Sequence, residues 1–172
     1  MSTGQARTPV VLGAGEGEAR WFLQNRTLIK ATAESTGGAY GLLESWVPPG
    51  ASPPLHVHYR EDEIFWVLEG ELTIRCGERT FGAGPGCYIA LPRGVPHTFV
   101  VEGDANVHML TLLSPGGGER FFVEAGRPAE GPGLPPEAPL DLAALERIAH
   151  RFGMAFVGAP LRPSREPAGS AA

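Results

Sequence analysis

Short apolar segments separated by glycine- and proline-containing turns run through most of this chain. Each segment is about as long as a β-strand, and none between residues 27 and 114 shows sustained helical periodicity. The 24 glycines and 17 prolines mostly stand between these segments. This pattern predicts an all-β fold, an antiparallel sandwich or barrel. The predicted strands are residues 20–23, 27–33, 39–47, 63–70, 71–76, 86–92, 97–101 and 106–114.

A different pattern follows the last predicted strand. A short helix and a proline-rich connector precede residues 141–153, which carry the signals of an amphipathic helix. Asp141 suits an N-cap and Gly153 a left-handed helix end. We expect this short helical appendage to pack on the outside of the barrel, because its apolar stripe must be buried. The stripe consists of Leu142, Leu145, Ile148, Ala149 and Phe152.

A chain of 172 residues is long enough for one domain with a substantial core. We predict an N-terminal tail over residues 1–19 and a β-barrel over 20–114. A C-terminal extension with the helix packed on the barrel is expected over 115–159, followed by a disordered tail over 160–172.

The net charge of −5 and the sequence pI near 5.5 argue against a nucleic-acid partner, which would favour a basic surface. No apolar run is as long as a membrane span, and the N-terminus lacks a secretory pattern. We therefore expect a cytoplasmic protein. Cys76 and Cys87 are too few for a disulfide framework and are interpreted as reduced thiols.

The stretch "HVHYREDE", residues 56–63, contains two of the five histidines. Alternate residues of a strand share a face, so His56 and His58 project together. Glu63 can rejoin that face if the intervening residues turn, and His97 follows the turn signal "PRGVP". Two imidazoles and one carboxylate form a good partial shell for a divalent transition metal, and His97 offers a fourth donor. An isolated His-x-His pair would instead be ordinary surface polarity.

The wider spacing resembles the two motifs of the cupin superfamily. The stretch "GASPPLHVHYREDEIFWVLEG" (50–70) matches every fixed position of the first motif. The stretch "GCYIALPRGVPHTFVV" (86–101) matches the second through His97, although Val101 stands where the family often has Asn. Only 15 residues separate the two motifs. Over most of residues 37–158 the chain is similar to bacterial quercetin 2,3-dioxygenase-like single-domain cupins.

The resemblance implies a cupin-type antiparallel β-barrel or jelly roll that binds one divalent metal per chain through His56, His58, Glu63 and His97. Fe(II) is the first expectation, while Mn, Co, Ni, Cu and Zn also suit such a shell. It further implies a dioxygenase acting with dioxygen on a small enolic or phenolic cyclic substrate, with Glu63 serving as a catalytic base as well as a ligand. The alternatives are a redox-neutral cupin, such as a polyketide cyclase or isomerase, and a non-catalytic small-molecule-binding cupin.

Strand alternation predicts which apolar side chains surround the metal. Phe65 and Val67 share the face of Glu63, and Phe99 and Val101 share the face of His97. These four residues would form an apolar substrate pocket, or else simply fill the barrel.

Other polar and aromatic residues receive weaker predictions. We expect His108 to be satisfied by a local hydrogen bond, His150 to be solvated, and Trp66 to pack between layers or subunits. Strand alternation does not predict whether the side chains of Tyr40 and Tyr88 reach the metal site. The stretch Arg60, Glu61 and Asp62 is interpreted as a charged turn outside the barrel.

A homodimer is the expected assembly. Residues 20–23 and 27–33 have the composition of edge strands, whose unpaired backbone groups a second subunit would cover.

Overall fold

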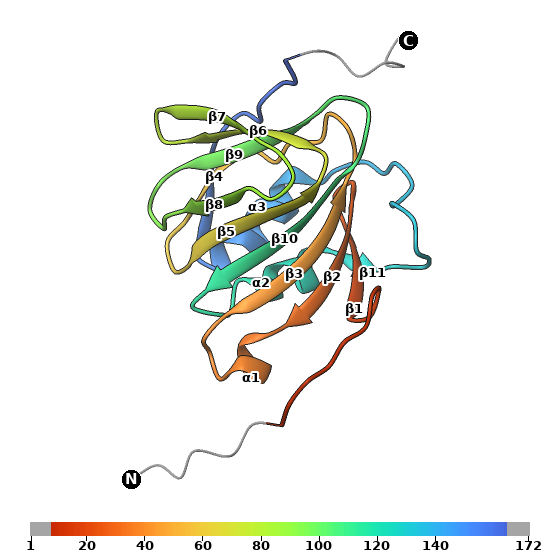
Figure 1. Cartoon of the computed structure of the whole chain (residues 1–172). Coiled ribbons are helices and arrows are strands. Elements are labelled where there is room, and N and C mark those ends of the chain that lie inside the picture. Colours follow the sequence, from red (N-terminus) through yellow and green to blue (C-terminus); the bar gives the residue numbers. More distant parts are fainter. Residues whose placement is uncertain (1–7, 165–172) are drawn as a thin grey trace.

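The computed structural model describes residues 8–164 and has two antiparallel sheets that face each other, with α3 behind them (Figure 1). The larger sheet has the order β11-β1-β2-β3-β10-β5-β8, and the smaller one β12-β4-β9-β6-β7. This is the predicted jelly-roll architecture. The strands before residue 115 are β1 (Glu18–Phe22), β2 (Asn25–Ala31), β3 (Gly41–Val47), β4 (Leu55–His58), β5 (Asp62–Glu69), β6 (Glu71–Cys76), β7 (Arg79–Ala83), β8 (Tyr88–Leu91), β9 (His97–Glu102) and β10 (Val107–Ser114).

The main hydrophobic core lies between the two sheets. On β5, Phe65 and Val67 point into it while Trp66 faces outward, as expected for alternating side chains. The side chains of Phe99 and Val101 on β9 meet them from the smaller sheet. The core thus forms because alternate apolar residues of both sheets pack face to face.

In the described part of the chain, three helices accompany the sheets: α1 (Ala33–Thr36), α2 (Glu119–Ala125) and α3 (Leu142–Arg151). The Asp141 side chain caps α3 by accepting a hydrogen bond from the backbone N–H of Ala144 at 2.9 Å, as predicted. The left-handed Gly153 follows the end of α3 with φ +75°. Leu145 and Ala149 of the apolar stripe are buried, but Leu142 is exposed.

The C-terminal extension also contributes to the sheets, which the sequence pattern did not indicate. β11 (Arg127–Pro128) pairs with β1, and β12 (Met154–Gly158) pairs with β4. Met154 lies opposite His58 and Phe156 opposite His56, so the extension borders the strand that carries two predicted ligands.

At both ends of the chain, some residues that were assigned to the tails belong to the barrel or are bonded to it. β1 begins at Glu18, before the predicted start of the barrel at residue 20. The backbone N–H of Leu161 donates to Ser52, and Ser164 donates to Glu102, so part of the expected disordered tail is bonded to the barrel. Residues 1–7 and 165–172 of the predicted tails lie outside the described residues.

Cys76 and Cys87 are free thiols, as predicted. Within residues 8–164 there is no helix with the length and apolar character needed to cross a membrane.

Candidate metal centre

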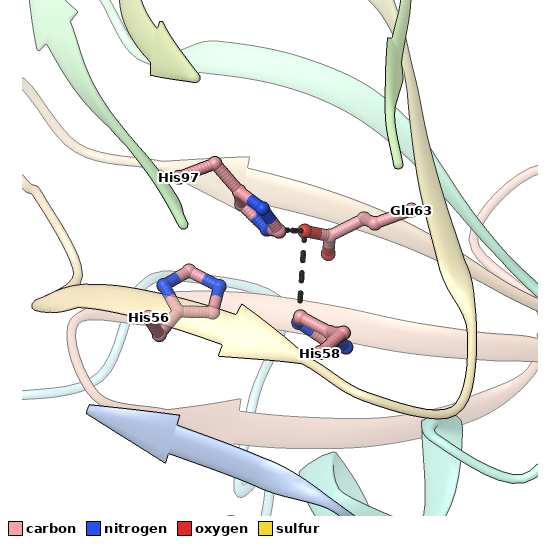
Figure 2. A group of neighbouring side chains, drawn as sticks. All are labelled: His56, His58, Glu63 and His97. Atoms are coloured by element: carbon pink, nitrogen blue, oxygen red, sulfur yellow. Dashed lines mark hydrogen bonds and ion pairs between the residues drawn. The ribbon is translucent and has the colours of Figure 1, made fainter. Parts of the chain in front are cut away.

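Four side chains from three strands converge between the two sheets (Figure 2). His56 and His58 lie two residues apart on β4 and share a face, and His97 stands opposite His56 on the neighbouring β9. Glu63 reaches them from β5 in the larger sheet. One ligand atom from each residue can be chosen so that all lie within 4.8 Å of one another. The structure thus brings together all four predicted metal ligands.

The chain turns sharply between His58 and Glu63, as their odd separation required. The backbone N–H of Tyr59 donates to Gly153 O at 2.8 Å, and that of Gly94 donates to His58 O at 2.7 Å. Asp62 accepts hydrogen bonds from the backbone and guanidinium of Arg93. These contacts hold the turn where β4 of one sheet passes to β5 of the other.

Each histidine uses its Nδ1 atom for a hydrogen bond and leaves Nε2 for the centre of the cluster. Nδ1 of His56 lies 2.8 Å from Pro54 O, and Nδ1 of His97 lies 3.0 Å from Val95 O. Nδ1 of His58 lies 2.9 Å from Oε1 of Glu61. A proton on Nδ1 leaves Nε2 of each ring directed toward the centre of the cluster, where it can bind a metal once it carries no proton.

The Nε2 atoms approach one carboxylate oxygen. Oε2 of Glu63 lies 3.0 Å from Nε2 of His97 and 3.8 Å from Nε2 of His58 (Figure 2). Donor atoms bound to one ion at about 2.0–2.2 Å are separated by roughly 3–3.5 Å, so the 3.0 Å spacing fits a common transition-metal ion and the 3.8 Å spacing is slightly wider. Three imidazoles and one carboxylate also match the ligand preference of such ions.

The protonation states of Glu63 and His56 favour metal binding. Burial alone would raise the pKa of Glu63, but the hydrogen bond from His97 and the neighbouring imidazoles lower it to about 2. Burial, followed by the charge of His97, lowers the pKa of His56 to about 4. At neutral pH the cluster therefore contains an ionised carboxylate and a neutral His56, both ready to act as ligands. Burial lowers the pKa of His58, but Glu61 and Glu63 together raise it above its ordinary value.

The metal cluster borders a cavity of about 970 Å³. Phe65 and Phe99, two residues of the predicted substrate pocket, line this cavity. Val67 and Val101 do not line it: both are fully buried in the core between the sheets. Strand alternation placed all four on the inner face but could not distinguish the residues nearest the metal from those packed deeper.

Much of the cavity wall comes from the C-terminal extension. Residues of the extension line the same cavity as the metal cluster, and most of their side chains are apolar. They include Phe121, Phe122, Leu134, Ala144, Leu145, Ile148, Met154 and Phe156. The expectation that α3 covers the outside of a sheet is thereby refined, because α3 packs with α2 and β12 beside the cavity.

Glu61 is the functional candidate that sequence reasoning missed. It was interpreted as part of a turn outside the barrel, but it is only 2% exposed and contacts the ligand His58. Its separation of three residues from His58 was the available signal. Only the packing around the turn shows that Glu61, unlike its neighbour Arg60, faces inward.

The remaining predicted positions lie away from the metal cluster. Nε2 of His108 donates a hydrogen bond to Glu44 at 2.9 Å, and the ring stacks on Trp46, so its expected hydrogen bond is confirmed with a partner on the neighbouring strand β3. His150 is exposed, as predicted. Tyr40 and Tyr88 are exposed and do not line the cavity.

Residues 45–113 match the cupin domain family. This segment is a cupin domain, as its motifs predicted. It is 30% identical over 123 residues to quercetin 2,3-dioxygenase of Bacillus subtilis, covering 72% of this chain and 36% of that protein. It is also 33% identical over 76 residues to an uncharacterized protein of Methanocaldococcus jannaschii, covering 44% of this chain and 59% of the relative. The chain thus spans less than two thirds of either relative's length.

Solved structures share the fold. A predicted oxalate decarboxylase from Thermotoga maritima has a TM-score of 0.55 at 19% identity, covering 62% of this chain and 99% of that one. KdgF from Halomonas sp. has a TM-score of 0.51 at 20% identity, covering 56% of this chain and 84% of that one. At these identities the likeness concerns the fold alone.

Proposed function

We propose that this chain is a metal-dependent cupin dioxygenase, similar in activity to quercetin 2,3-dioxygenase, that acts on a small enolic or phenolic cyclic substrate. The observation that carries the proposal is the buried cluster of three histidines and one glutamate beside a largely apolar cavity. The similarity to quercetin 2,3-dioxygenase of Bacillus subtilis supports the oxygenase class.

His56, His58, Glu63 and His97 would hold the metal. A bound divalent transition metal would supply Lewis acidity and, in the case of Fe(II), redox chemistry with dioxygen. We expect Fe(II), with Mn, Co, Ni, Cu and Zn as the other candidates.

The protein side chains have separate tasks in this proposal. Phe65 and Phe99 give a planar ring an apolar surface and exclude water beside the metal cluster. Glu63 lies in the cavity wall and is ionised in the metal-free protein, where its pKa is lowered to about 2. With so low a pKa it would act as a base only toward a hydroxyl that a bound metal has made more acidic. One of its carboxylate oxygens would accept the proton of the substrate hydroxyl and keep the substrate in its electron-rich, deprotonated form.

Oxygen consumption is the direct test. The chain is purified without added metal, its metal content is measured, and flavonols and other enolisable phenols are screened with an oxygen electrode. We expect oxygen uptake with at least one substrate, and its loss after the metal is removed with a chelator. Turnover that continues without oxygen would contradict the proposal and favour a redox-neutral cyclase or isomerase. Binding of the same compounds without turnover would favour a non-catalytic cupin.

Glu63→Gln tests the proposed base. The substitution keeps the size of the side chain and one oxygen donor but removes its basicity. Proton transfer by a positioned side chain contributes about 10²–10⁴-fold, so turnover per bound metal ion should fall on that order. Glu69→Gln is the matched control, because Glu69 is an exposed glutamate on the same strand. Unchanged turnover per metal ion in Glu63→Gln would exclude Glu63 as the base.

A further inference from the structure

Glu61 is a buried carboxylate at the turn between β4 and β5. Only 2% of it is exposed, and its Oε1 lies 2.9 Å from Nδ1 of His58. A buried carboxylate is costly unless it is hydrogen-bonded or paired. Its placement against a predicted metal ligand therefore needs an explanation.

The three histidines of the cluster differ in their Nδ1 partners. His56 and His97 each use the backbone carbonyl of the residue two positions earlier, at 2.8 Å and 3.0 Å. His58 instead uses the side chain of Glu61. Hydrogen bonds to an ionised acceptor are stronger than those to a neutral carbonyl. Of the three ligand rings, His58 thus has the partner that raises ligand basicity most.

The C-terminal extension lies directly against Glu61. A methyl group added at Gly118, the residue that precedes α2, would lie 2.5 Å from Oε1 of Glu61 and 3.1 Å from Leu113. The backbone of Gly118 therefore packs closely against the carboxylate. Because Gly118 has φ −64°, alanine would fit its backbone conformation, and only the crowding forbids a larger residue.

We propose that Glu61 is a positioning residue for the metal ligand His58. By accepting the Nδ1 proton, Glu61 fixes the ring with Nε2 directed toward the cluster and makes His58 the strongest imidazole donor to the metal. The role of Gly118 is to keep the carboxylate at this distance. The inference rests on metal binding by the cluster, one part of the proposed function, and is independent of the oxygen chemistry.

Cobalt(II) binding tests the inference without any enzymatic activity. Affinities are measured by competition with a chromophoric chelator, and absorption spectra are recorded at full occupancy. Loss of an outer hydrogen-bond partner typically lowers metal affinity about 10–100-fold, and we expect that loss for Glu61→Ala. Glu61→Gln, which keeps a neutral acceptor, should fall between Glu61→Ala and the wild type. Both variants should shift the cobalt absorption bands, because the donor strength of His58 changes.

Three further variants complete the experiment. Gly118→Ala should weaken cobalt binding in the same direction, since it displaces the carboxylate without removing any polar group. Glu69→Gln removes one exposed negative charge from the strand that carries Glu63 and should bind cobalt as the wild type does. His97→Ala, which removes a proposed ligand, gives the reference for a severe loss.

Wild-type affinity and unchanged spectra in both Glu61→Gln and Gly118→Ala would overturn the positioning role, even if Glu61→Ala failed to fold. Weaker binding with unchanged spectra at full occupancy would also overturn it, because a purely structural role predicts that result. If the wild type bound no cobalt and no other divalent transition metal, the metal site and the proposed function would fail together. Metal binding in the wild type therefore separates failure of the inference from failure of the function.

Discussion

His56 and His58 have pKa values shifted in opposite directions, although both belong to one cluster. His58 lies between Glu61 and Glu63 and has a raised pKa, whereas burial and the charge of His97 lower the pKa of His56 to about 4. Bringing a metal to the cluster displaces protons from these rings, so metal affinity should weaken as the pH falls.

The metal-free protein should become less stable below pH 6.5 because of His56. Its pKa falls from 6.5 in the unfolded chain to about 4 in the folded one. The unfolded state therefore binds more protons in this interval, and stability present above pH 6.5 is lost as the pH falls toward 4. At pH 5 the loss is about 2 kcal/mol. Denaturant unfolding in a chelator at pH 7 and pH 5 should show a smaller difference for His56→Gln than for the wild type.

The other groups with shifted pKa values do not remove the expected difference between His56→Gln and the wild type. Glu63, with its pKa near 2, titrates below the tested interval. His58, with a raised pKa, contributes stability below pH 6.5 that is lost at higher pH, the opposite sense to His56. His150→Gln is the control, since His150 is exposed and should leave the wild-type pH dependence unchanged. Equal pH dependence in His56→Gln and the wild type would contradict the assignment.

At the level of the strands, the turn from β5 to β6 depends on glycine for two reasons. Gly70 has φ +81°, a conformation that residues with a side chain rarely adopt. An added methyl group would also lie 2.7 Å from the backbone oxygen of Asn106 in the loop before β10. This turn carries the chain from β5, the strand of Glu63 in the larger sheet, to β6 in the smaller sheet.

Gly70→Ala should therefore destabilise the protein more than Gly86→Ala. Gly86 has nearly the same backbone angle, φ +83°, but no atom lies within 4 Å of a methyl group added there. The left-handed conformation alone costs alanine about 1–2 kcal/mol, which is the loss expected for Gly86→Ala. Gly70→Ala adds a clash with backbone and should lose more. Thermal and denaturant unfolding of both variants measures the difference; equal losses would show that the contact with Asn106 is relieved cheaply.

For the whole molecule, the homodimer remains a prediction, but its structural basis changes. β2 lies inside the larger sheet between β1 and β3, and β11 pairs with β1, so residues 20–33 do not form the open edge that the sequence suggested. A different apolar surface is available on the outer face of this sheet. Trp66 is 49% exposed, Tyr88 60% and Leu68 37%, and Trp66 lies directly opposite Tyr88 on β8.

We expect light scattering at micromolar concentration to give twice the chain mass of 18.2 kDa. A contiguous apolar surface of this kind is a typical subunit contact, and a charge introduced there should disrupt it. Trp66→Arg is therefore expected to give a monomer. Tyr59→Arg is the control, because Tyr59 is similarly exposed but lies outside this sheet. A monomeric wild type would reject the homodimer, and a dimeric Trp66→Arg would move the interface elsewhere.

The sequence by itself indicated most strands of the barrel, although not β7, and it indicated the four-residue cluster. Alternation places His56 beside His58 on one face, and the turn signals before Glu63 and His97 return those residues to the same space. These inferences succeed because strand periodicity and turn chemistry are local properties of the chain. The cap at Asp141 and the helix end at Gly153 were predictable for the same reason.

The tertiary structure decided which residues surround the cluster. Glu61 is buried because Gly118, far along the chain, packs against it, and Val67 lies too deep in the core to line the cavity. β12 pairs with β4 although its sequence gave no strand signal that we recognised. Burial and the pairing of distant strands depend on contacts between segments remote in sequence, and a local pattern carries no information about which segments will meet.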